Sequence, residues 1–555
     1  MRFARLGGIW LCLLALSACG GDDAPAPGPI VVAPAPTPSP PPVATETDAA
    51  ASPRGVDAQP LSATDVIVTW RDATGDETGF RIERRDGANW TEVATVAANV
   101  TSRRLSGLGG GEQAFRVSAV RPTGVAVPSA IATATMPSAL APQIFFVDAA
   151  AGNNANPGTE AQPWATIQKA HDVMTAGQTV LVRAGLYTRP NYFTIVQVNR
   201  SGTAGAPITF KAFPGERPKL RSTKGVNFNG FEVRANYVVI DGFEIEGHLS
   251  EVTLAEARTD QQARQAGGPV VALTASSGIT FGRNNRTDPV VHHVTARNNI
   301  VRDHPQSGIN ALASDYVTFE NNRVSNTGRY SYFGGSGINI FEPRDFDTNV
   351  TEYRNVVRGN ISEGNSNEIP CGCFGYRQPT DGNGIIMDNF NNTGYTGRTL
   401  IMNNIVRDNG GRGIHVFQSG NVDVFFNTTY RNSTIAITGE GEITMRNATN
   451  VRVLNNIMVA SADRPANLVA TSTNVLFDFN LIFSGTSFTQ AGGSSNLTGT
   501  DPLFVTTTGA MAFMLSSGSL AVDRAGGGVP IPMVDAYLAP RPRGRTADIG
   551  AVESL

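Results

Sequence analysis

A short motif built on Gly-Ile recurs along the C-terminal half of this 555-residue chain. Its copies are Ser277-Gly278-Ile279-Thr280, Ser307-Gly308-Ile309-Asn310, Ser336-Gly337-Ile338-Asn339, Asn383-Gly384-Ile385-Ile386 and Arg412-Gly413-Ile414-His415. The glycines follow one another at steps of 30, 29, 47 and 29 residues. Such a period is typical of a solenoid, in which each repeat forms one coil and buries its apolar face against its neighbours.

A second repeat, built on asparagine, runs beside the first. Its members are Asn298-Asn299, Asn321-Asn322, Gly359-Asn360, Asn403-Asn404, Asn427-Thr428, Asn455-Asn456 and Asn480-Leu481. Asparagine tolerates the left-handed backbone of turns, so one turn per coil would stack these amides into a hydrogen-bonded ladder. The two repeats together predict an all-β fold, a right-handed parallel β-helix, over residues 140–555.

Residues 56–137 carry a different pattern. Apolar and polar residues alternate over 65–70, 79–84 and 114–120, and glycine-rich turns separate these runs. This pattern predicts a small antiparallel β-sandwich. The segment resembles a fibronectin type III domain, with Trp70 and residues 115–120 carrying the likeness. The resemblance implies a spacer module.

The N-terminus has the features of an export signal. A basic start is followed by an apolar run that ends in Leu16-Ser17-Ala18-Cys19. Residues 1–19 resemble a bacterial lipoprotein signal, which implies that Cys19 is lipidated after cleavage. Gly20, rather than Asp, follows the cysteine, which implies sorting to the outer membrane. Residues 20–55 are rich in Pro and Ala and predict an extended linker. We therefore expect a lipid-anchored protein of the cell envelope, facing either the periplasm or the cell surface.

The two ends of the predicted solenoid carry a family resemblance. The segments that show it are residues 146–148, 163–170, 205–210, 501–504 and 548–553. They resemble the N- and C-terminal parts of the β-helical polysaccharide lyases, the group that includes pectate lyases, chondroitinase B and alginate lyases. The resemblance implies an enzyme that cleaves an extended, acidic, uronate-containing polysaccharide by β-elimination, although fold alone does not determine the reaction.

Strand geometry assigns the repeated residues to two faces. Side chains alternate along a strand, so if the isoleucines of the Gly-Ile copies point inward, the residues after them point outward. The outward residues are Thr280, Asn310, Asn339, Ile386 and His415, and two positions further on Gly282, Leu312, Phe341, Asp388 and Phe417. We therefore expect His415 and Asp388 to lie on adjacent coils of one exposed face.

Elimination next to a carboxylate needs a group that neutralises it, a base and an acid. The catalytic candidates are His415, Arg412, Asp388 and Asn339, with His415 as the base and Arg412 and Asn339 or Asn383 as neutralising groups. The substrate-binding candidates are Asn310, Asn383, His304, Arg377 and Tyr376. Asp381 and Asp388 form a candidate pair for Ca²⁺, which prefers oxygen ligands.

Lysine is absent from the repeated coils. The four lysines, Lys169, Lys211, Lys219 and Lys224, all precede the first Gly-Ile copy. The resemblance implies a lysine base in calcium-dependent lyases, so here His415 or an arginine would take that role, or the protein is not a lyase. The alternatives are a hydrolase using Asp381, Asp388 and Asp408, an epimerase, or a β-helix that binds glycan without catalysis.

Two insertions interrupt the repeat. Residues 248–268 are polar and favour a helix over 249–265, and residues 363–380 account for the 47-residue step. The second insertion holds Cys371 and Cys373, which either form a local disulfide or remain buried thiols. The net charge of −3 does not indicate a charged partner. We expect the partners to be a polysaccharide and the membrane, with no nucleic acid, and the chain to be a monomer.

Overall fold

The structure is a computed structural model that describes residues 52–125, 128–137, 143–285, 287–372, 375, 377–435, 440–509 and 512–554. Regular structure in these residues is almost entirely β, with two α-helices, α1 (Ile167–Val173) and α2 (Leu254–Gln265). This confirms the predicted all-β class. No helix in these ranges is long and apolar enough to cross a membrane.

The first group of strands forms two antiparallel sheets. One sheet contains β1 (Arg54–Pro60), β2 (Val66–Arg71) and β5 (Ser102–Leu105); the other contains β3 (Gly79–Asp86), β4 (Asn89–Ala97), β6 (Gly111–Arg121), β7 (Gly124–Val125) and β8 (Ala132–Met136). Both sheets contribute to a single apolar core, in which the rings of Trp70 and Phe80 lie 5.4 Å apart. The segment is therefore a β-sandwich, and its kinship with fibronectin type III domains stays a prediction.

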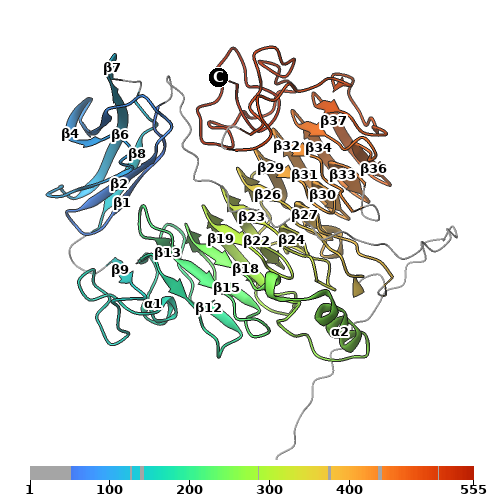
Figure 1. The fold of residues 1–555 in the computed structure, drawn as a ribbon, viewed down its shortest axis with the longest axis horizontal. Helices are drawn as coiled ribbons and strands as arrows, with labels where there is room; N and C mark the ends of the chain where they lie inside the picture. Colours follow the sequence, from blue (N-terminus) through green and yellow to red (C-terminus); the bar gives the residue numbers. More distant parts are fainter. Residues whose placement is uncertain are drawn as a thin grey trace, which may run out of the picture. The chain divides into compact units, whose positions relative to one another are not determined.

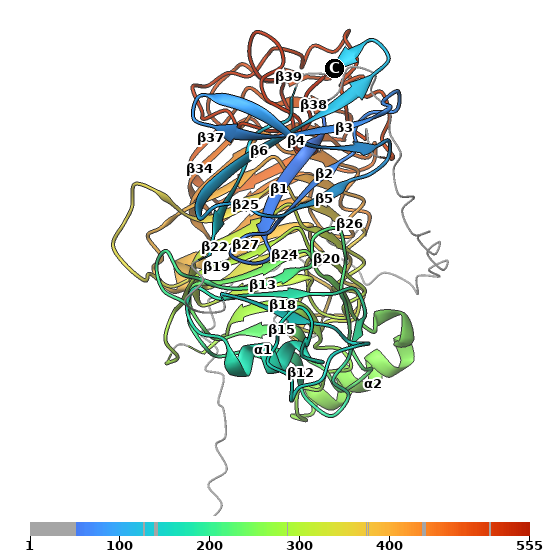
Figure 2. The same cartoon turned by 90° about the vertical axis from the view of Figure 1, so that its left-hand side faces the viewer.

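The remaining strands form three long parallel sheets (Figures 1 and 2). Sheet I consists of β9 (Ile144–Val147), β10 (Thr179–Val182), β13 (Ile208–Ala212), β16 (Val238–Asp241), β19 (Val291–Arg297), β22 (Ser314–Glu320), β25 (Tyr353–Arg358), β28 (Arg398–Met402), β31 (Gly420–Phe425), β34 (Thr449–Leu454) and β37 (Thr473–Asp478). Sheet II consists of β11 (Leu186–Tyr187), β14 (Lys219–Arg221), β17 (Glu244–Glu246), β20 (Ile300–Arg302), β23 (Arg323–Ser325), β26 (Ile361–Glu363), β29 (Ile405–Arg407), β32 (Thr428–Tyr430), β35 (Ile457–Val459), β38 (Leu481–Phe483) and β39 (Leu497–Thr498). Sheet III consists of β12 (Thr194–Val198), β15 (Asn229–Val233), β18 (Ser277–Gly282), β21 (Ile309–Leu312), β24 (Ile338–Phe341), β27 (Ile385–Asp388), β30 (Ile414–Phe417), β33 (Ile443–Arg446) and β36 (Asn467–Ala470). Each full coil supplies one strand to each sheet, which confirms the predicted parallel β-helix.

The Gly-Ile motif lies in sheet III with the expected register. Ile279, Ile309, Ile338, Ile385 and Ile414 pair from strand to strand and are fully buried in the shared core. The residues that follow them pair in the same way on the outward side, from Thr280 to His415. The period of the sequence therefore predicts the register of five strands residue by residue.

The asparagine repeat lies at the two-residue turns from sheet I to sheet II. Each side-chain amide donates to the side-chain oxygen of the next coil at 2.9–3.0 Å, from Asn299 through Asn322, Asn360, Asn404, Asn427, Asn456 and Asn480 to Asn496. The first residue of such a turn has a positive φ, for example 57° at Asn298 and 60° at Asn403. The predicted ladder is confirmed, and it satisfies buried amides that would otherwise destabilise the core.

The glycines of the repeated motif mark the closest approach of sheet III to sheet II. Their φ angles are not positive, so space rather than backbone freedom requires glycine. A Cβ there would overlap the neighbouring side chain in these pairs: Gly278 with Val301, Gly308 with Val324, Gly337 with Ser362 and Gly384 with Val406. In the coil that contains β33, Glu442 takes the place of the motif glycine. Its carboxylate accepts hydrogen bonds from the backbone and side chain of Asn432 at 2.8 and 2.5 Å.

Both insertions enter at the connection from sheet II to sheet III. The first, between β17 and β18, forms a 3₁₀ turn (Leu249–Glu251) and α2, whose N-cap Thr253 and Glu256 make a capping box. The helix predicted for residues 249–265 is therefore confirmed. The second insertion joins β26 to β27. In the coils that carry the asparagine ladder, by contrast, every turn from sheet I to sheet II has two residues.

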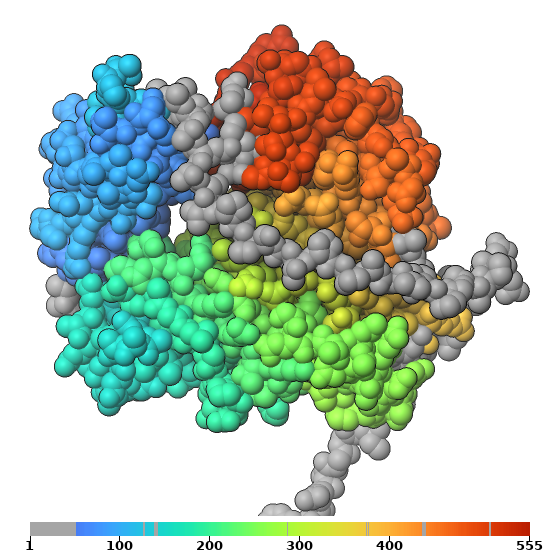
Figure 3. All heavy atoms as spheres, in the orientation of Figure 1, coloured from blue at the N-terminus to red at the C-terminus, as the bar shows by residue number. Residues whose placement is uncertain are grey.

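The two ends of the β-helix are covered. At the N-terminal end, α1 buries Ile167 and Ala170 in the main core (Figure 1). Near the C-terminal end, residues 501–554 pack Phe513, Met514 and Ile549 over the outer face of sheet II. Figure 3 shows the coils of the β-helix as spheres, with the colour changing from teal to red in sequence order.

Candidate functional site

The outward side of sheet III carries two parallel rows of side chains. The first row runs Gln197, Glu232, Thr280, Asn310, Asn339, Ile386, His415, Thr444 and Leu468. The second row includes Gly282, Leu312, Phe341, Asp388, Phe417 and Arg446. The predicted placement of His415 and Asp388 on adjacent coils is therefore correct. Their offset of one strand and two residues corresponds to about 8 Å between Cα atoms.

The expectation that this face is exposed is wrong for its central coils. Asn310, Ile386 and His415 are each only 3% exposed, and Thr280 is 7% exposed. The strand pattern shows which side of the sheet a residue occupies but not whether surrounding segments cover it. The central coils of the face therefore hold polar groups that are largely shielded from water, where electrostatic interactions are stronger than in solvent.

His415 lies in this shielded region on β30. Its Nδ1 is 2.6 Å from the hydroxyl of Thr444 on the next coil, and its ring lies 5.6 Å from that of Phe417. Burial lowers the pKa of His415 well below its usual value, and the positive charges of Arg412 and Arg446 lower it further. The imidazole is therefore neutral at pH 7, which is the form that accepts a proton.

Asp388 is on the neighbouring strand β27. Burial raises the pKa of Asp388 well above its usual value, and the charges of Asp381 and Glu342 raise it further. Its Oδ1 is buried and has no hydrogen-bond partner, and the same is true of Oδ1 of Asn339 on β24. Buried polar atoms in native proteins nearly always have partners, so two orphans on adjacent strands of one face indicate a place where a ligand binds.

Arg412 begins the coil of β30 and is fixed by its neighbours. Its Nε and Nη2 contact Glu440 at 3.0 and 2.7 Å, and its Nη1 donates to the carbonyl of Thr380 at 2.6 Å. Arg446 pairs with the same carboxylate. Burial opposes ionisation of Glu440, but Arg412 and Arg446 outweigh it and hold the pKa of Glu440 below its usual value. Two guanidinium groups thus share one carboxylate, which leaves a net positive charge beside His415.

Asn383 and His304 occupy structural positions. Asn383 is fully buried, and its amide donates to Ser336 and Asp381 at 3.2 and 3.1 Å. His304 is also fully buried, neither ring nitrogen has a partner, and burial lowers its pKa to about 3. His304 precedes its Gly-Ile copy in a turn that points into the core, so its side chain does not reach the outward face. The predicted substrate-binding roles of Asn383 and His304 therefore do not fit their places.

The other predicted residues lie at different distances from the face. Asn310 is on the first row and donates to Ser277 at 3.0 Å. Arg377 is exposed on the second insertion, and Tyr376 lies outside the described residues. Asp408 follows β29 and is half-exposed at the turn leaving sheet II, away from Asp388. Cys371 is buried and disulfide-bonded, and Cys373 lies outside the described residues.

The described residues do not form a calcium site. Both oxygens of Asp381 already accept hydrogen bonds, from Thr380 at 2.5 Å and from Asn383 at 3.1 Å. Asp388 is the other carboxylate of the predicted pair, and burial raises its pKa well above its usual value, which disfavours the charged form that Ca²⁺ binds. No group of three or more His, Cys, Asp or Glu side chains within the described ranges is arranged to hold a metal ion. Ca²⁺ takes six to eight oxygen ligands, so this donor set does not fit it as it stands.

The N-terminal end of the same face was not foreseen. Glu232 on β15 occupies the first row, beside Arg234 and Arg283, and these residues line a cavity of ≈ 560 Å³ with Tyr192 and Phe193. The sequence contains a signal for this coil in Asn229-Gly230-Phe231-Glu232, a sixth copy with Phe in place of Ile. It precedes Gly278 by 48 residues because α2 lies in between.

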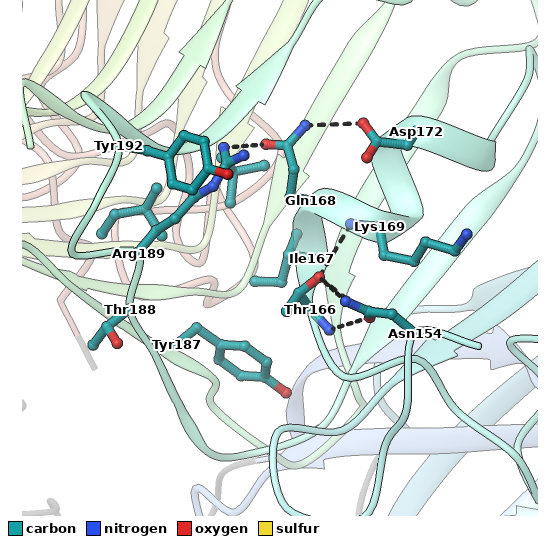
Figure 4. Close-up of a pocket in the computed structure, with 12 residues that line it drawn as sticks. Asn154, Thr166, Ile167, Gln168, Lys169, Asp172, Tyr187, Thr188, Arg189 and Tyr192 are labelled. Atoms are coloured by element: carbon teal, nitrogen blue, oxygen red, sulfur yellow. Dashed lines mark hydrogen bonds between the residues drawn. The ribbon is translucent and has the colours of Figure 1, made fainter. Parts of the chain in front are cut away.

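A second cavity, of ≈ 380 Å³, adjoins the first and shares Arg189 and Tyr192 with it. It lies between α1 and the connection from β11 to β12. Figure 4 shows the ring of Tyr192 over the guanidinium group of Arg189, which points to Gln168. The guanidinium carbon is 3.7 Å from the ring centroid, and Nη1 donates to Gln168 at 3.1 Å. Both cavities are open to solvent at the end of sheet III farthest from His415.

Comparison with known proteins assigns the β-helix to a family. The protein is 36% identical to pectate lyase PEL9 of Emericella nidulans over 128 residues, 23% of this chain and 25% of that protein. It is 37% identical over 65 residues to the uncharacterized protein YwoF of Bacillus subtilis, 12% of this chain and 13% of YwoF. The chain thus matches a quarter or less of the length of these curated relatives.

A solved structure of pectate lyase Pel9A aligns with 74% of this chain and 96% of its own, at 15% identity and a TM-score of 0.41. A model of the Pel9A-like right-handed β-helix region matches residues 145–450, which is more than half of the chain and includes every strand of sheet III from β12 to β33. The protein therefore belongs to the Pel9A-like right-handed β-helix family.

Proposed function

We propose that this protein cleaves an extended, acidic polysaccharide by β-elimination on the outward face of sheet III. The observation that carries the proposal is the meeting of a neutral imidazole, His415, with two unpartnered buried oxygens, those of Asp388 and Asn339. Membership of a family whose members include pectate lyases supports it. PEL9, which is similar over part of its length, is named as a pectate lyase.

The reaction needs three roles on this face. His415 removes the proton from the carbon next to the sugar carboxylate, and the electron pair forms a carbon–carbon double bond as the glycosidic C–O bond breaks. Asp388, whose raised pKa favours the protonated form, gives its proton to the leaving oxygen. The net positive charge of Arg412 and Arg446 beside Glu440 stabilises the negative charge that develops on the substrate carboxylate. The amide of Asn339 donates to the same carboxylate.

A hydrolase is the second candidate, and one observation favours it. Asp388 and Asp381 are neighbouring carboxyl groups, and the charge of Asp381 raises the pKa of Asp388, as suits a general acid. Asp408, the third carboxylate of that hypothesis, lies on another side of the coil.

The deciding experiment incubates the full chain with polygalacturonate, alginate and other uronate polymers and follows two signals. A lyase produces ultraviolet-absorbing unsaturated ends and reducing ends in equal amounts, whereas a hydrolase produces reducing ends alone. Exchange of deuterium into the polymer without cleavage would indicate an epimerase. Binding of the polymer without any of these products would reject the lyase, hydrolase and epimerase hypotheses.

Calcium dependence is tested in the same assay. We expect activity to survive a chelator, because burial already neutralises Asp388 and hydrogen bonds occupy Asp381. Loss of activity with a chelator and its return with Ca²⁺ would show that the two carboxylates recruit further oxygen ligands and would restore the calcium prediction.

We also propose that lipidation of Cys19 anchors the protein in the outer membrane. The sequence Leu16-Ser17-Ala18-Cys19 and the following glycine support this proposal. Cys19→Ser should abolish incorporation of a labelled fatty acid and release the protein from the membrane fraction. Unchanged labelling and fractionation of this variant would contradict the anchor.

A further inference from the structure

The cavity at the N-terminal end of sheet III has more positive than negative charge. Glu232 is its one carboxylate among the residues that line it, and three arginines, Arg189, Arg234 and Arg283, surround it. Arg234 donates to Oε1 of Glu232 at 2.8 and 2.5 Å, and Arg283 reaches the same oxygen at 3.3 Å. Within the described part of the chain, Arg189 forms no ion pair and donates to Gln168 instead. One carboxylate therefore faces three guanidinium groups.

Aromatic rings stand exposed at the rim of this cavity. Phe193 is 76% exposed and Tyr192 is 56% exposed, although both are large apolar side chains on the connection into β12. Phe193 contacts Phe228 edge-on, with 6.0 Å between ring centroids, so its face remains open. Exposed aromatic surface beside convergent polar groups is the usual composition of a ligand site.

The floor of the cavity continues into the row that carries His415. Gln197 and Glu232 line the cavity and are the first two residues of that row. Five strand spacings separate Glu232 from His415, which corresponds to about 24 Å. Thr280, Asn310 and Asn339 lie between them along the row. A polysaccharide that runs parallel to this row and is longer than about 24 Å would reach both regions at once.

We propose that this cavity binds a carboxylated sugar unit of the polysaccharide, several units away from the bond that is cleaved. The inference rests on the proposed function for its polymer and names a distal binding subsite. Arg283 and Arg189 bind the carboxylate, because a guanidinium fork matches a carboxylate and each group uses only one of its nitrogens in these contacts. The side chain of Arg283 is 50% exposed and makes one long contact, so it can turn toward the ligand. Phe193 and Tyr192 pack against the sugar ring.

Binding is measured with the full chain in the His415→Ala background, so that turnover does not consume the ligand. The probes are polygalacturonate and alginate, with uncharged dextran as the neutral polymer. The parent should bind both polyuronates and not dextran. Arg189→Gln combined with Arg283→Gln should weaken polyuronate binding about tenfold or more, as expected for loss of charge-assisted hydrogen bonds.

The matched control is Arg358→Gln. Arg358 is 52% exposed at its side chain and pairs with a single carboxylate, Glu320, but it lies on sheet I. It should change binding less than about twofold. Phe193→Ser provides a second test that does not alter charge or any buried contact, and it should also weaken binding. Equal melting temperatures of the variants confirm that they are folded.

Unchanged binding in the double arginine variant, or failure of the parent to bind either polyuronate, would overturn the subsite. The two proposals fail separately. If the arginine substitutions weaken binding but no cleavage product forms, the subsite proposal stands and the lyase proposal is rejected. If the polymer is cleaved but substitution of Arg189, Arg283 and Phe193 does not weaken binding, the lyase proposal stands and the subsite proposal is rejected.

Discussion

The N-terminal and C-terminal ends of the outward face of sheet III differ in the environment of their charged side chains. At the N-terminal end of sheet III, Glu232 forms ion pairs with Arg234 and Arg283, whose side chains are 29% and 50% exposed. On the C-terminal coils, burial lowers the pKa of His415 and raises the pKa of Asp388, and so favours the neutral form of both. The same repeat therefore supplies two chemistries. Ion pairs with partly exposed arginines suit reversible binding, whereas buried acids and bases with shifted pKa values suit proton transfer.

The largest effect should come from removing the imidazole. We expect His415→Ala to lower kcat by about 10²–10⁴-fold, the usual contribution of a positioned base, with little change in polymer binding. Initial rates of unsaturated product formation measure this change. His293→Ala is the matched control, because His293 stacks on Tyr316 of sheet I at 4.3 Å, and it should keep the parental rate. Full activity of the His415 variant would show that the catalytic base does not lie on these coils.

The second effect concerns pH. Asp388 must be protonated to act as an acid, so the rate should fall as pH rises through its raised pKa. Asp388→Asn stays neutral at every pH, and we expect it to lose about 10²-fold in kcat together with this alkaline limb. The pH profile of kcat provides the measurement. Asp408→Asn is the control, since burial also raises the pKa of Asp408 but it lies away from the face. An unaltered alkaline limb in Asp388→Asn would assign the acid elsewhere.

A third prediction tests the shielding of the C-terminal coils through stability. Burial raises the pKa of Glu442 to about 8. Between its unfolded pKa, about 4.5, and 8 the folded state holds a proton that the unfolded state releases, so stability falls as pH rises. The limiting slope for one proton is about 1.4 kcal/mol per pH unit. Buried histidines such as His415, whose pKa is lowered, contribute a slope of the opposite sign below about pH 6.5, so the variant is compared with the parent. In denaturant unfolding at pH 5–8, the slope of stability against pH should be more positive in Glu442→Gln than in the parent, by up to this amount.

Glu440→Gln is the control for that measurement. Arg412 and Arg446 lower the pKa of Glu440 against the effect of burial, so its contribution to stability is lost only as pH falls through that lowered pKa. The Glu440 variant should be less stable than the parent but keep the parental slope between pH 5 and 8. A slope in Glu442→Gln that equals the parental slope would mean that water reaches Glu442 in the folded protein.

The smallest effect should come from the cavity at the N-terminal end of sheet III. Arg283→Gln should raise KM about threefold on long polygalacturonate and leave kcat unchanged, because one exposed charge contact contributes little. Oligomers too short to span the roughly 24 Å between Glu232 and His415 should show no change. Arg358→Gln should leave both parameters unaltered. A change in kcat, or an equal change on short oligomers, would contradict a distal role for this cavity.

The sequence predicted the register of the face but not its environment. Alternation along the strand and a nearly constant period are enough to place Asp388 diagonally from His415. The burial of both residues depends on segments that no periodicity describes, and this is why the face was expected to be exposed. His304 was misplaced for a related reason, since it precedes its strand in a turn that points into the core.

The sequence did not predict the cavity at the N-terminal end of sheet III, because two features set the coil of β15 apart from the repeated motif. Phe231 replaces the isoleucine of the motif, and α2 stretches the spacing to 48 residues. The arginines of the cavity are also scattered along the chain, at 189, 234 and 283, and only the winding of the coils brings them together. Calcium was predicted from two carboxylates in sequence, and it stays a prediction. The hydrogen bonds that Asp381 accepts and the raised pKa of Asp388, which only coordinates reveal, weigh against it.

The asymmetry between the turns has a practical meaning. The turn from sheet I to sheet II is held at two residues by the asparagine ladder, which runs unbroken from Asn299 to Asn496. The connection from sheet II to sheet III has accepted both α2 and the segment around Cys371, and it opens directly beside the working face. Insertions at this corner therefore change the segments beside the face without interrupting the ladder. An engineer who transplants segments at that corner would alter ligand preference while the two-residue corner that carries the asparagine ladder continues to specify the scaffold.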